Sequence, residues 1–155
     1  MAHWKQPETV FAEYEIALTL PGRWQLRPSD APMRWLYRSA EKHREHFSIT
    51  REDPGGIEGE EKATLLRWVA RQRRSVELGF GRGSALVMSE PEHTERFGVP
   101  VTSYRGAAPS ADHHFHVFFL FPPRTLWILV YDAFRLTEEQ AEAHAQAIID
   151  SVVLQ

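Results

Sequence analysis

HFHVFFLFPPRTLWILVYDAF, residues 114–134, is the stretch of this sequence that decides the fold. Two apolar runs, 114–121 and 126–134, are separated by Pro122-Pro123-Arg124-Thr125. Each run has the length of a strand and is rich in aromatic and β-branched residues. Runs that are apolar at nearly every position are typical of strands covered on both faces. The stretch therefore predicts a hairpin at the centre of a sheet.

Strand patterns also precede this hairpin. Apolar and polar residues alternate over 10–19, the period of a half-buried strand, and Leu20-Pro21-Gly22-Arg23 is a turn signal. A short strand is expected around Trp24 and Leu26. Further strands are predicted over residues 33–39, 46–51, 85–89 and 99–104, with 90–98 as a connection.

Two segments have the helical period instead. Over 60–76 the residues Leu65, Val69 and Val76 recur on one helical face, and Gly79 is the expected stop. Thr137 and Gln140 form a capping-box pattern that opens a second helix, which we expect to run to the end of the chain. The sequence therefore predicts one α+β domain over residues 1–155: an antiparallel sheet of about six to eight strands, with a mid-chain helix and a C-terminal helix packed on it.

Composition narrows the function classes. The 155 residues carry a formal net charge of −3, which gives no general attraction to nucleic acid. The absence of cysteine excludes disulfides, thiolate metal sites and cysteine nucleophiles. No apolar run approaches the roughly 20 residues of a membrane-spanning helix, and residues 1–15 lack the apolar core of a signal peptide. We therefore expect a cytoplasmic protein without a membrane span.

A family resemblance follows from the order of these segments. It rests on the opening strand with Leu20-Pro21-Gly22-Arg23-Trp24, the 47–50 strand, the mid-chain helix, the 99–104 strand, the final hairpin and the closing helix. In these features the chain resembles the PsbP-like and DcrB-like fold family over nearly its whole length. Members of that family include photosystem accessory subunits, a nuclear transport factor that binds a small GTPase, and secretion-system chaperones. The resemblance implies a PsbP-like sandwich and a noncatalytic binding role.

The histidines near residue 114 are the best chemical candidates. His114 and His116 share one face of a strand and would hold a metal if a third ligand, His93 or Asp132, converged on them. The alternative is that they are ordinary loop and sheet residues, because two ligands on one strand do not make a site. We expect no cofactor.

Other motifs have a structural reading beside a functional one. Residues 79–84 superficially resemble a phosphate loop, but they follow a helix and lead into a strand, which favours a turn. The arginines 67, 71, 73 and 74 are a basic strip or a solvated helix face. Ser84, Ser103 and the Glu90, Glu92 and His93 group offer nucleophile and acid/base chemistry, but no serine lies in a Gly-x-Ser-x-Gly elbow.

The apolar hairpin supports the functional prediction. Two helices are few for so apolar a sheet, and an exposed row of Phe118, Leu120, Trp127 and Leu129 would mark an interaction site. We therefore predict a protein-binding, chaperone-like or adaptor module, such as an effector chaperone or immunity protein of a bacterial secretion system. Its partner would be a protein, with an apolar effector segment or a second copy of the chain as candidates. The alternatives are a small metal-binding protein or enzyme that uses His114 and His116, and an apolar-ligand carrier.

Overall fold

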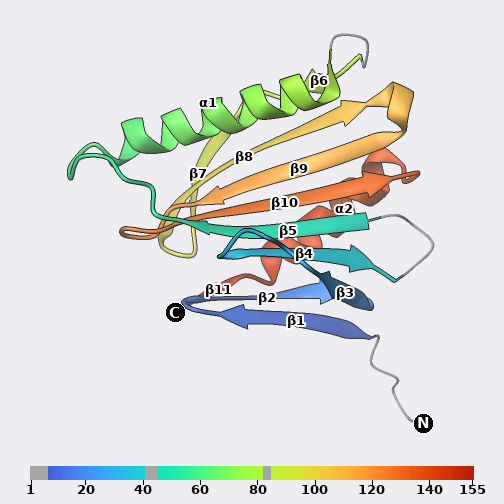
Figure 1. The fold of residues 1–155 in the computed structure, drawn as a ribbon, viewed down its shortest axis with the longest axis horizontal. Coiled ribbons are helices and arrows are strands. Elements are labelled where there is room, and N and C mark those ends of the chain that lie inside the picture. The colour runs from blue at the N-terminus through green and yellow to red at the C-terminus, as the bar shows by residue number, and fades with distance from the viewer. Residues whose placement is uncertain (1–6, 41–44, 82–84) are drawn as a thin grey trace.

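The computed structural model describes residues 7–40, 45–81 and 85–155, which form two antiparallel sheets and two long helices (Figure 1). The strands are β1 (Glu8–Glu13), β2 (Ile16–Pro21), β3 (Trp24–Arg27), β4 (Arg34–Ser39), β5 (Glu45–Glu52), β6 (Val87–Met88), β7 (Glu92–Arg96), β8 (Val99–Ala108), β9 (His113–Leu120), β10 (Leu126–Phe134) and β11 (Val153–Leu154). The helices are α1 (Glu61–Phe80), the 3-10 turn η1 (Pro109–Ala111) and α2 (Glu138–Asp150).

The larger sheet has the order β3-β4-β5-β10-β9-β8-β6, and β7 pairs with β8 on the same side as β6. The smaller sheet has the order β1-β2-β11. All of these pairings are antiparallel, and β10 lies between β5 and β9 at the centre of the larger sheet. The predicted antiparallel α+β architecture and the predicted central hairpin are therefore confirmed.

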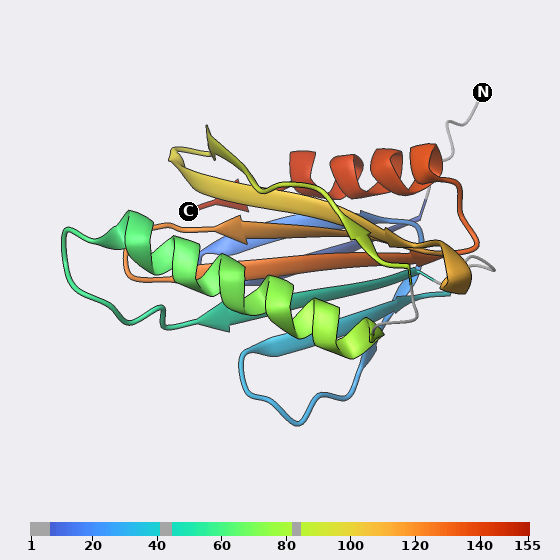
Figure 2. The ribbon, with the colours of Figure 1, turned by 90° about the horizontal axis from the view of Figure 1, so that it is seen from above.

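Each face of the larger sheet carries its own apolar core, because alternate residues of a strand point to opposite faces. On β10, Leu126 and Ile128 pack toward α1, whereas Trp127 and Leu129 pack toward α2 and the smaller sheet. Figure 2 shows α1 and α2 on opposite sides of the sheet. Both faces of the central strands are therefore covered.

The strand predicted over residues 10–19 is a hairpin. β1 and β2 are joined by a turn at Tyr14 and Glu15, with Tyr14 at φ 54°. Phe11 is buried before the turn and Ile16 after it, so the buried positions change from odd to even numbers. A turn residue inside the apparent alternation gave the sequence the pattern of one longer strand.

Two short strands and one helix end also differ from the prediction. β7 lies inside the predicted connection 90–98, and β11 follows α2 where the helix was expected to close the chain. α1 passes through Gly79 and ends at Phe80, with Gly81 (φ 74°) in the capping position. By contrast, the capping box of Thr137 and Gln140 forms as predicted.

Candidate functional site

The row predicted to be exposed lies on the α2 face of the sheet, but most of it is covered. Leu120, Trp127 and Leu129 are each 0% exposed, and only Phe118 is partly exposed. Trp127 stacks on Trp35 at 6.2 Å between ring centroids, and its indole N–H donates to Glu15 at 3.1 Å. The β1–β2 hairpin and α2 together cover this row, so these three side chains form core and offer no surface.

An open groove remains beside this core, at the edge of the sheet between α2 and strands β7 to β9. We call it the α2 groove. It has a volume of about 330 Å³ and is lined by Ser89, Glu92, Ser103, Tyr104, Arg105, His116, Phe118, Glu142 and Gln146. The partly exposed member of the predicted row, Phe118, and one of the predicted histidines, His116, therefore meet in the same place.

The α2 groove is polar and carries both signs of charge. Arg105 on β8 forms an ion pair of 3.2 Å with Glu142 on α2, across the groove. Glu92 on β7 is exposed and forms no ion pair with any residue in the described part of the chain. Burial lowers the pKa of His116 to about 4, so the imidazole is neutral at pH 7.

The predicted metal ligands do not come together. His114 and His116 lie on the α2 face of β9, whereas the two candidate third ligands lie on the α1 face. There the Asp132 carboxylate contacts His113 at 2.7 Å and His93 contacts Thr102 at 2.8 Å. Within residues 7–40, 45–81 and 85–155, no three His, Asp or Glu side chains are grouped so that they could hold a metal ion.

The other sequence motifs have structural roles or lie outside the described residues. Of residues 79–84, the first two end α1 and Gly81 caps it, while 82–84, with the candidate Ser84, lie outside the described residues. Three of the four arginines contact other residues of this chain. Arg67 donates to the Thr64 hydroxyl, and Arg71 lies over the Trp68 ring. Arg73 donates to the Ser89 carbonyl and lies over the Tyr104 ring. Within the described ranges, no helix is both long and apolar enough to cross a membrane.

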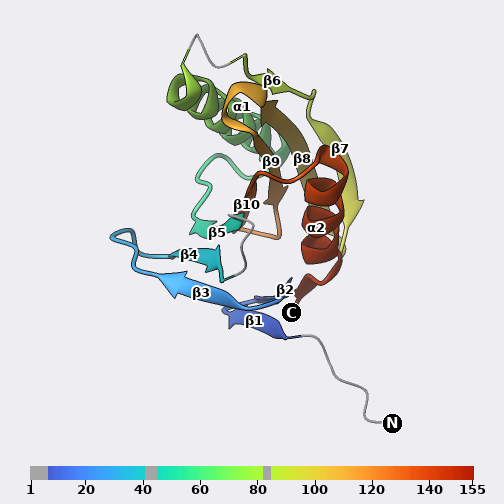
Figure 3. The same ribbon diagram turned by 90° about the vertical axis from the view of Figure 1, so that its right-hand side faces the viewer.

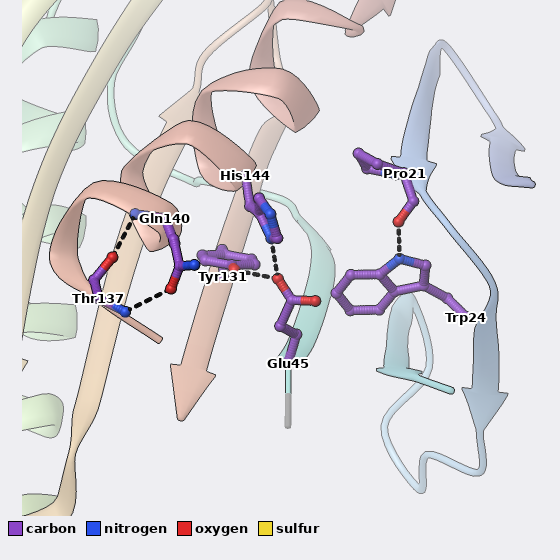
Figure 4. A network of polar contacts seen from close by, with 7 residues as sticks. All are labelled: Pro21, Trp24, Glu45, Tyr131, Thr137, Gln140 and His144. Carbon is purple, nitrogen blue, oxygen red and sulfur yellow. Dashed lines mark hydrogen bonds and ion pairs between the residues drawn. The ribbon is translucent and has the colours of Figure 1, made fainter. Parts of the chain in front are cut away.

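One polar network was not predicted. Glu45 at the start of β5 is 5% exposed, and its carboxylate accepts hydrogen bonds from the Tyr131 hydroxyl at 2.5 Å and from His144 on α2 (Figure 4). Burial, together with the hydrogen bond to Glu45, raises the pKa of Tyr131 well above its usual range. The network joins α2 to β5 and β10. Its only sequence signal is that His144 shares the helix face of Ala141 and Ala145.

No protein-family model and no curated protein sequence matches this chain. Among solved structures, cyanobacterial PsbP (CyanoP) of Synechocystis sp. PCC 6803 is similar with a TM-score of 0.65 and 10% identity, over 98% of this chain and 95% of that chain. A Bacteroides thetaiotaomicron protein reaches a TM-score of only 0.44 at 12% identity, over 90% of this chain and 45% of its own. The chain therefore has a PsbP-like fold, as its sequence predicted.

Proposed function

We propose that this chain is a noncatalytic protein-binding module that contacts its partner at the α2 groove. The observation that carries the proposal is the position of the groove: it lies between α2 and strands β7 to β9, at the edge of a sheet whose central strands are covered on both faces. A groove at the sheet edge continues into the exposed surface of β7. A partner could therefore contact more surface than the groove itself provides.

The chemistry of the groove favours a polar partner surface. Its volume of about 330 Å³ is near the lower limit of small-molecule sites, and its walls carry Glu92, Arg105 and Glu142. An apolar ligand would remove water from the ion pair of Arg105 with Glu142, and from Glu92, which has no ion-pair partner among the described residues; both effects are unfavourable. The carrier alternative, and an apolar effector segment as partner, are therefore less well supported than a charged protein segment.

The metal or enzyme alternative has weaker support. His116 is a neutral imidazole in the groove, as metal ligation requires. Of the other predicted metal ligands, however, His114 alone lies on the same face of the sheet. Metal analysis of the purified protein tests this alternative: stoichiometric metal that is lost in His116→Ala would favour it over protein binding. We further propose that the protein is cytoplasmic and that it acts as an adaptor or effector chaperone in a bacterial secretion system.

The test is affinity capture from native lysate with the tagged chain and two matched variants. Glu142→Lys reverses a charge in the groove, whereas Glu139→Lys makes the same change on the same helix outside it. Both positions are exposed, so the fold should be retained, since exposed ion pairs contribute little to stability. We expect a protein that binds the parent chain and Glu139→Lys but not Glu142→Lys. Capture that both variants retain, or both lose, would contradict the proposal.

A further inference from the structure

We infer that β7 binds an extended, basic segment of a partner protein as an added strand beside the α2 groove. The inference rests on the proposed protein-binding function and names the class of partner segment. It depends on three features: the direction of the β7 backbone groups, the openness of the edge, and its charge.

The backbone direction follows from the β7–β8 hairpin. Phe97 (φ 57°) and Gly98 (φ 75°) form a two-residue loop with two positive φ angles, and such loops are flanked by a hydrogen-bonded pair, here Arg96 and Val99. The next pair, Glu95 and Pro100, is then not hydrogen-bonded. This agrees with Pro100, which has no N–H and whose carbonyl accepts from Phe121 on the opposite side of β8 at 3.0 Å.

Hydrogen-bonded and non-bonded pairs alternate along an antiparallel ladder. The pair of His93 with Thr102 is therefore also non-bonded. The N–H and C=O groups of His93 and Glu95 consequently point away from β8. These four groups form a short template for another strand, the geometry used in β-strand addition.

The outer edge of β7 is open. In the described part of the chain, β8 is the one strand that pairs with β7, and the first four residues of β7 are exposed. Figure 3 shows β7 along the outer margin of the sheet beside α2. A strand could approach this edge without displacing another element.

The charge of the edge selects a basic strand. The nearby arginines are paired with acidic residues of α2: Arg96 on β7 contacts Asp150 at 2.7 Å, and Arg105 on the neighbouring β8 contacts Glu142 at 3.2 Å. Glu92 and Glu95 form no ion pair with any described residue. Charge on an edge strand opposes pairing with neutral or acidic strands, while opposite charges on neighbouring strands attract. Glu92 and Glu95 lie on opposite faces of β7, so a strand with lysine or arginine on both faces would place one basic side chain beside each glutamate. The basic side chain beside Glu92 would lie in the α2 groove.

The probe is a capped seven-residue peptide of threonine and valine with two lysines three residues apart, so that they lie on opposite faces. The control peptide has glutamate in place of both lysines. The readout is the chemical shift and hydrogen exchange of the backbone amides in the isotope-labelled full chain. We expect the lysine peptide to slow exchange at His93 and Glu95, and the glutamate peptide to bind about tenfold more weakly, since two cross-strand charge pairs change sign.

Two variants separate backbone pairing from charge. Glu95→Pro removes an N–H that points away from β8, so the hairpin should be retained while strand addition is lost. A double variant, Glu92→Gln with Glu95→Gln, keeps every backbone group and should weaken the lysine peptide about fivefold. If circular dichroism shows that Glu95→Pro is unfolded, the double variant and the amide exchange of the parent chain still decide whether β7 binds a basic strand.

The possible failures are distinguishable. If a captured partner depends on Glu142 but the lysine peptide leaves His93 and Glu95 unprotected, strand addition is overturned and the proposed function stands. Protection of these amides that disappears on dilution without any peptide would identify a second copy as the occupant and would also overturn the inference. If the lysine peptide protects both amides but no lysate protein depends on Glu142, the edge is confirmed as a strand-binding site and the proposed function fails at the groove.

Discussion

Two buried tyrosines, Tyr131 and Tyr104, allow a sharp test of the structure. Removing the hydroxyl is the same chemical change at both positions, but the structure predicts a different effect on stability at each. Tyr131 is 0% exposed and its hydroxyl donates to the buried Glu45 carboxylate at 2.5 Å. Tyr104 is 3% exposed, and no residue in the described part of the chain forms a hydrogen bond with its hydroxyl. A hydrogen bond to a charged group contributes about 1.5–3 kcal/mol, whereas a buried polar group without a partner costs about 1–3 kcal/mol.

We therefore expect Tyr131→Phe to lower the free energy of unfolding by about 2 kcal/mol and Tyr104→Phe to leave it unchanged or raise it by about 1 kcal/mol. For a chain of this size the first change lowers Tm by about 4–8 °C. Urea unfolding followed by tryptophan fluorescence measures both variants under the same conditions. Equal destabilisation of the two variants would refute the assignment of the Glu45 network as a stabilising contact.

Three further predictions concern stability. Since burial lowers the pKa of His116 to about 4 from an ordinary value near 6.5, the unfolded chain takes up a proton first as the pH falls. The free energy of unfolding should decrease by up to about 3 kcal/mol between pH 6.5 and pH 4, and His116→Gln should remove that part of the pH dependence in urea titrations. Gly106→Ala should destabilise by about 1–3 kcal/mol in the same assay, because a Cβ there would lie 2.2 Å from the Phe115 ring. Trp127→Phe should cost about 1–3 kcal/mol through the lost hydrogen bond to Glu15, a loss that thermal unfolding would detect and that Glu15→Ala, which removes the acceptor, should largely reproduce.

The parts of the fold that could be predicted are those with a local physical cause. β10 matches its predicted bounds because a run that is apolar at nearly every position has one low-energy placement, at the centre of a covered sheet. The second helix begins as predicted because the Thr137 and Gln140 side chains satisfy free backbone N–H groups within one turn. Neither feature depends on what lies elsewhere in the chain.

The parts that could not be predicted depend on distant partners. β7 has the sequence EHTER, with no apolar residue to bury, and it is a strand only because β8 provides its hydrogen bonds. The burial of Trp127 likewise depends on Glu15 and Trp35, which are far away in the sequence. A pattern within one strand indicates which residues share a face, but it does not indicate what covers that face.

The covering of both faces also limits where recognition can take place. The apolar row on the α2 side holds the smaller sheet and α2 in position, so a partner that competed for Leu120 or Leu129 would have to displace part of the core. Removing the Trp127 side chain would cost about 3–5 kcal/mol, and loss of binding in such a variant would report unfolding as readily as a contact. Our proposal therefore places recognition at the rim, where Phe118, Glu92 and the open edge of β7 lie together. The same apolar pattern that first marked the hairpin as a binding surface therefore builds the scaffold, and in our proposal the polar edge strand beside it provides the surface that a partner contacts.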